Sequence, residues 1–79
     1  MNKEEKEHKQ FLEQQLQLCK QWDQILEEIE IKLYKMKGIA QSVIDNKLDP
    51  AEMDPLNHQL NELKSEVHFL QKQLESVVH

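Results

Sequence analysis

The stretch VIDNKLDPAEMDPL, residues 43–56, lies between two long runs of regularly spaced apolar residues. Upstream of it, apolar side chains recur at alternating spacings of three and four residues, with Gln15 as a polar exception. The same spacing resumes at Met53, within the stretch, and continues to Val77. Repeats of this kind are typical of two helices that pack against each other along their length.

The stretch itself carries two helix start signals, because Asp49-Pro50 and Asp54-Pro55 each place an N-cap acid before a proline. The first signal, with Glu52 three residues after Asp49, resembles a capping box and could open one short turn. The second signal is expected to open the second helix. Asn46 can take the left-handed conformation that ends a helix. The predicted elements are a helix over about residues 4–45, a connection over about 46–54 and a helix over about 55–77.

A short connection folds two helices back on each other, so the sequence predicts an all-α fold, an antiparallel two-helix hairpin. We expect one domain over residues 1–79 that assembles into a four-helix bundle as a homodimer. Two registers fit the connection: Val43 near Met53 with Val77 against Cys19, or Val43 near Leu60 with Val77 against Leu26. The residues expected in the hairpin seam are Leu26, Ile29, Leu33, Met36, Ala40, Val43, Leu56, Leu60, Leu63, Val67, Leu70, Leu74 and Val77.

The first helix is predicted to be longer than the second, by about 20 Å or more at 1.5 Å per residue. Its unpaired half is apolar, and a third apolar column, formed by Phe11, Leu18, Ile25 and Ile39, runs beside the two seam columns. A band of this width is typical of three- and four-helix bundles. The residues expected to form a self-association interface are Phe11, Leu12, Leu16, Leu18, Cys19, Trp22 and Ile25.

Composition restricts the classes of partner. The chain has 79 residues and a formal net charge of −5, and its basic residues are all lysine. Nucleic acid and anionic membrane surfaces are therefore not expected as partners, since both favour a positive face. No stretch reaches the roughly 18 apolar residues that a membrane span requires, and the first ten residues lack an apolar signal-peptide core. We expect a cytoplasmic protein, in which the single Cys19 is a small buried hydrophobic residue.

Residue patterns that carry chemistry are few. Glu5-x-x-His8 has the spacing of half a di-iron site, but such a site needs a second copy and further inward-facing acids. Hairpin phosphatases that act on response regulators carry Ser-Gln-Glu-Leu-Asp, whereas this chain reads NHQLN at residues 57–61 and lacks both the serine and the acid. We expect no enzymatic activity, no cofactor, no metal and no small-molecule substrate.

A second group of apolar residues faces away from the predicted seam. Ile31, Tyr34 and Gly38 recur at helical spacing on the outer side of the first helix, and Phe69 lies off the seam of the second. They are either scattered surface residues or a second face for a protein client. The leading hypothesis is a self-associating interaction module that acts as an adaptor, an export chaperone or a small regulatory protein. The alternative is a subunit of a larger coiled-coil assembly with a different partner.

Overall fold

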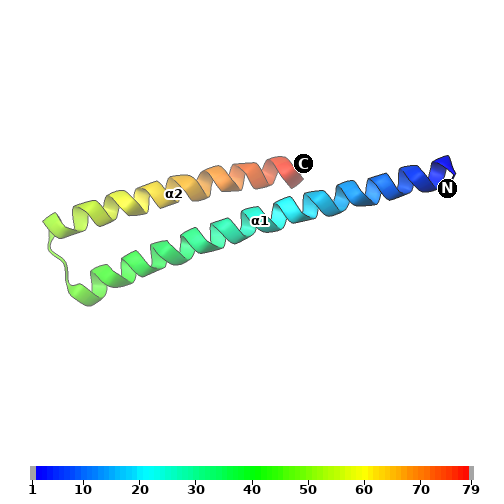
Figure 1. Ribbon diagram of the computed structural model, residues 1–79. Helices are drawn as coiled ribbons and strands as arrows, with labels where there is room; N and C mark the ends of the chain where they lie inside the picture. The colour runs from blue at the N-terminus through cyan, green and yellow to red at the C-terminus, as the bar shows by residue number, and fades with distance from the viewer. Residues whose placement is uncertain (1, 79) are drawn as a thin grey trace.

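The protein is two antiparallel helices joined by a short connection, α1 (Lys3–Asn46) and α2 (Pro50–Val78) (Figure 1). The computed structural model describes residues 2–78, with the side chains of residues 2–77. The molecule is a rod, with extents of 70 × 18 × 12 Å. The predicted all-α hairpin, with a long first helix and a shorter second one, is confirmed.

α1 begins with a capped turn and continues without interruption for 44 residues. Oδ1 of Asn2 accepts a hydrogen bond from the backbone N–H of Glu5 at 2.8 Å. Glu4 and Glu5 lie in the first turn, where negative charge is favourable against the helix dipole. Gly38 lies inside α1 and keeps an ordinary negative φ, so it does not interrupt the helix.

The left-handed residue that ends α1 lies one position later than expected, at Lys47 instead of Asn46. Asn46 remains helical, with its side-chain amide donating to the carbonyl oxygen of Ser42 at 2.9 Å. Lys47 takes the left-handed conformation instead, with φ 48° and ψ 53°. This conformation places the Cβ of an L-residue close to the following carbonyl oxygen, so Lys47 is a strained cap.

α2 begins at Pro50 rather than at Pro55, because the first of the two start signals is the one that opens it. Asp49 caps the helix: its Oδ1 accepts from the N–H of Glu52 at 2.8 Å, and its carbonyl accepts from the N–H of Met53 at 3.0 Å. The connection is therefore residues 47–49, and Pro55 lies inside α2. Packing of Met53 and Leu56 against α1 accounts for this start, since both are half-buried and a helix beginning at Pro55 would leave Met53 outside it.

The contact between the helices is narrow. Its most buried side chains are Ile29, Val67 and Leu70, which are 9%, 8% and 6% exposed. Ile25 and Met36 pack against this cluster. The remaining half-buried apolar residues are Ile39, Val43, Leu48, Met53, Leu56, Leu60, Leu63, Leu74 and Val77. A core this small is weak for a chain of 79 residues, because such chains need considerable burial to offset conformational entropy.

The register lies between the two alternatives. Nζ of Lys32 lies 2.9 Å from Oε2 of Glu66 and links the two helices near the middle of α2. Val77 lines the same surface hollow as Gln21, Gln24 and Ile25, so α2 ends beside the part of α1 between Cys19 and Leu26. The earlier residues of α1 extend beyond α2, at the blue end of the chain in Figure 1.

The seam on α1 differs from the expectation at Leu26, Leu33 and Ala40, which are exposed rather than buried. The column that faces α2 is instead Ile25, Lys32 and Ile39. Both columns flank Ile29 and Met36 at helical spacing, so apolar periodicity alone fits either one. Lys32 can occupy the seam because its methylene stem lies along apolar surface while its ammonium reaches Glu66.

Candidate protein interaction surface

Among residues 2–78, no group of three or more His, Cys, Asp or Glu side chains is placed to hold a metal ion. Glu5 and His8 are exposed near the start of α1 and belong to no such group. His58 Nε2 lies 3.0 Å from Glu62 Oε1 on the exposed surface of α2, an ordinary pair at i and i+4. Neither described helix is long and apolar enough to cross a membrane.

The main feature of the surface is an exposed apolar column on α1, which we call the α1 column. It consists of Leu12, Cys19, Leu26, Leu33 and Ala40, spaced by seven residues. Leu12, Leu26 and Leu33 are 53%, 43% and 50% exposed. From Leu26 onward the column runs directly beside the buried contact with α2, so it extends the apolar face of α1 outward.

The second feature is the part of α1 that has no partner among the described residues of α2, residues 3–20, which we call the overhang. All of its side chains are exposed, and it would extend about 27 Å at 1.5 Å per residue. Its large apolar side chains are between 40% (Leu18) and 57% (Leu16) exposed. The overhang residues expected in the self-association interface are Phe11, Leu12, Leu16, Leu18 and Cys19.

Trp22 and Ile25, the two residues of the expected interface that follow the overhang, differ in their exposure. Trp22 is 42% exposed. Ile25, by contrast, is half-buried and packs against the cluster around Ile29. Cys19 is a free and exposed thiol, so the expectation that it is buried does not hold within a single chain.

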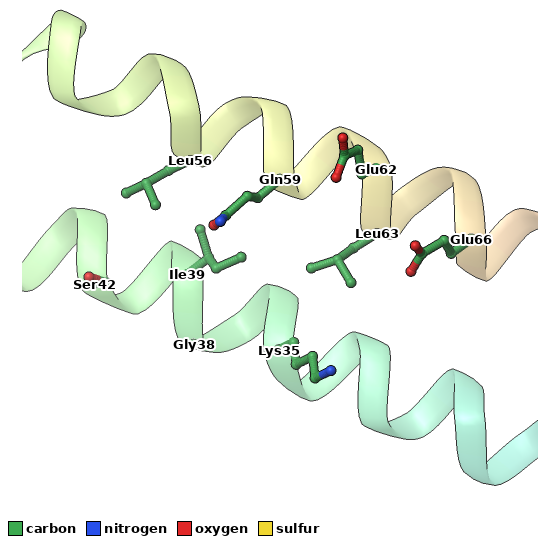
Figure 2. A pocket seen from close by; sticks show the side chains of 9 residues that line it. All are labelled: Lys35, Gly38, Ile39, Ser42, Leu56, Gln59, Glu62, Leu63 and Glu66. Atoms are coloured by element: carbon green, nitrogen blue, oxygen red, sulfur yellow. The ribbon is translucent and has the colours of Figure 1, made fainter.

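A groove lies between the helices on the side away from the α1 column (Figure 2). Its volume is about 490 Å³, and Ile39, Leu56 and Leu63 point into it between the two ribbons. Its remaining lining residues are polar or small: Lys35, Gly38, Ser42, Gln59, Glu62 and Glu66. A Cβ added to Gly38 would meet no atom within 4 Å, so the missing side chain leaves open space here.

The candidate second face lies partly on this groove side. Phe69, which is 61% exposed, lines a hollow that shares Glu66 with the groove. Ile31 and Tyr34 are 49% and 77% exposed and line a separate hollow with Glu27, Glu30 and Lys35. The structure therefore does not gather Phe69, Gly38 and Tyr34 into a single hollow.

The sequence reasoning missed one feature of the helix contact, the ion pair between Lys32 and Glu66. Its signal was a gap in the third apolar column, where Lys32 interrupts the series of Phe11, Leu18, Ile25 and Ile39. A single lysine in an apolar seam is a known way of fixing helix register.

Comparison with protein-family models, curated proteins and solved structures gives no match to this chain.

Proposed function

We propose that this protein is a non-enzymatic protein–protein interaction module that binds other helices through the apolar surface of α1. The observation that carries the proposal is the exposure of the α1 column and the overhang in a hairpin whose own contact buries so few side chains. Helices of stable proteins bury an apolar band of this width against a neighbour. An adaptor, an export chaperone and a small regulatory or inhibitory protein would all use such a surface.

The mode of binding would be helix packing, with affinity from leucine, phenylalanine and tryptophan and with specificity from the charged residues alongside. Trp22 and Phe11 are the candidate anchors, because large aromatic side chains contribute most to interfaces when they are buried. Self-association into a four-helix bundle is one form of this function. In that form the overhang and the α1 column would be covered by a second hairpin.

In the alternative, a different protein covers the apolar surface of α1, and the chain is a subunit of a larger coiled-coil assembly. The exposed aromatic residues Tyr34 and Phe69 favour a further contact with a client in either case. They lie outside the α1 column, so a client could bind there while the column remains covered.

The proposal is tested by light scattering on the purified chain over a range of concentrations. The wild-type chain should associate, and the double variant Leu26→Lys/Leu33→Lys should not, because two charges would then need burial. Ile31→Lys is the matched control, since Ile31 is 49% exposed against 50% for Leu33 but lies outside the column. An equal effect of both variants would contradict the assignment of the surface.

Amide hydrogen exchange separates the two forms of the proposal. In a self-associated protein the overhang should be protected. In a subunit that awaits a different partner, the isolated chain should be helical yet exchange rapidly in residues 3–20. A monomer whose overhang exchanges slowly would contradict the proposal itself, because the overhang would then need no cover.

A further inference from the structure

We propose that the occupant of the α1 column is a second copy of this chain, with the two α1 helices antiparallel and the two-fold axis at Leu26. The inference rests on the proposed function and specifies its partner and register. A two-fold axis makes the interface isologous, so the same residues contribute from both chains. In this register Leu26 meets its own copy, Cys19 meets Leu33 of the second chain, and Leu12 meets Ala40 of the second chain.

The extent of the α1 column supports this register. The column begins at Leu12 and ends at Ala40, and Leu26 is its middle member. An axis at Leu26 therefore gives every member an apolar partner, whereas a shifted axis leaves members at one or both ends facing water or charge. Apolar burial is the dominant favourable term in association, so the register with the greatest overlap is favoured.

The length of the overhang supports it as well. With the axis at Leu26, residues 3–20 of one chain lie beside residues 32–49 of the other, which comprise the end of α1, where α2 already packs against it, and the connection. Each overhang then contacts an existing hairpin, at opposite ends of the assembly. The new contact continues the buried face between α1 and α2, because the α1 column runs directly beside that face.

Charge on the overhang does not oppose this pairing. Lysines and glutamates are equally numerous along residues 3–20, so the overhang carries no net charge at neutral pH. Near the axis, Asp23 and Glu30 of both chains come together on the flank of Leu26. Repulsion between exposed like charges of this kind weakens association by less than the burial of a leucine side chain strengthens it, so the dimer is still favoured. We expect Glu30→Gln to lower the dissociation constant of the dimer by about two- to tenfold. Glu62→Gln, in the groove on the side away from the α1 column, should leave it unchanged.

Cysteine cross-linking tests the register directly. Cys19 is the only cysteine, so Cys19→Ser gives a background without thiols. In that background Leu26→Cys should form an intermolecular disulfide in high yield, since the two thiols meet across the axis. Leu33→Cys should not, because its copy would lie about 21 Å away along the helix, beyond the reach of a disulfide.

With native Cys19 retained, Leu33→Cys should cross-link, because each introduced thiol then meets Cys19 of the second chain. The wild-type chain, with Cys19 alone, should not cross-link. Ile31→Cys in the Cys19→Ser background is the matched control on a different face and should remain uncross-linked. This pattern, in which Leu33→Cys depends on Cys19 and Leu26→Cys does not, is specific to an antiparallel dimer with this axis.

Sedimentation of the same proteins separates failure of the register from failure of the proposed function. A dimer that cross-links equally at every single position would be parallel and would overturn the inference. A dimer that fails to cross-link through Leu26→Cys would also overturn it, although self-association would stand. A chain that stays monomeric at every concentration would refute the inference that a second copy covers the α1 column. The proposed function would then require a different protein as the partner.

Discussion

The most direct test of the exposed column is a comparison of Leu70→Ala with Leu33→Ala. Leu70 is 6% exposed and Leu33 is 50% exposed in the single chain. Replacing leucine by alanine removes three carbon groups, worth roughly 2.4 kcal/mol when they are fully buried. Leu70→Ala should therefore cost about 2.5–3.5 kcal/mol per chain, including a modest cavity term, since the contact of two helices can partly collapse.

For Leu33 the expected loss depends on what covers it. If the side chain faces water as it does in the single chain, half of the transfer term is lost, about 1.2 kcal/mol per chain. If a second copy covers it, the loss should approach that of Leu70→Ala. The free energy of unfolding is measured by urea titration with circular dichroism, at a concentration where the unfolding midpoint shifts with concentration.

The ratio of the two losses is the decisive quantity. A ratio near one indicates that Leu33 is buried in the assembled protein. A ratio near one half, at the same concentration, would refute the assignment of Leu33 to an interface. Ser65→Ala is the control for both, because Ser65 is exposed on α2 and should change the free energy of unfolding little.

Three further substitutions test local features of the helices by thermal unfolding. Gly38→Ala should stabilise the protein by about 1 kcal/mol, because alanine is the better helix former and its methyl group meets no atom; a loss at assembled concentrations would instead reveal a neighbour packed against this position. Lys47→Gly should raise the free energy of unfolding by about 1 kcal/mol, and with it the melting temperature, because glycine adopts the left-handed conformation without strain. An unchanged or lower melting temperature would argue against the left-handed cap. Pro55→Ala should stabilise α2 by roughly 1–3 kcal/mol, since it restores a donor for the carbonyl of Ala51; destabilisation would indicate that α2 begins at Pro55 instead.

The fold class followed from local chemistry. The spacing of apolar residues along both helices, together with the break at residues 46–49, is sufficient to predict two helices and a hairpin. On α2, the residues expected in the seam are all buried or half-buried, and Met53 is half-buried as well. The sequence also indicated that α1 would extend beyond α2, since the spacing continues upstream for longer than it continues downstream.

The tertiary structure decided which face of α1 meets α2. α1 has three apolar columns, and two of them, one through Ile25 and one through Leu26, lie on either side of Ile29, about 40° and 60° away around the helix. Packing against α2 selects the column of Ile25, with Lys32 reaching Glu66, and leaves Leu26 and Leu33 exposed. The choice between these two columns depends on contacts between residues far apart in the chain. The apolar pattern within one helix does not specify those contacts.

The start of α2 was also decided by packing between the helices. Asp49-Pro50 and Asp54-Pro55 are both local start signals, and the first also has Glu52 at the capping-box position. Burial of Met53 and Leu56 against α1 favours the earlier start and places Pro55 inside the helix. Local sequence thus determined that there are two helices. Contacts between the helices determined where α2 starts and which residues of α1 remain exposed, because a side chain of one helix is buried only by contact with the other.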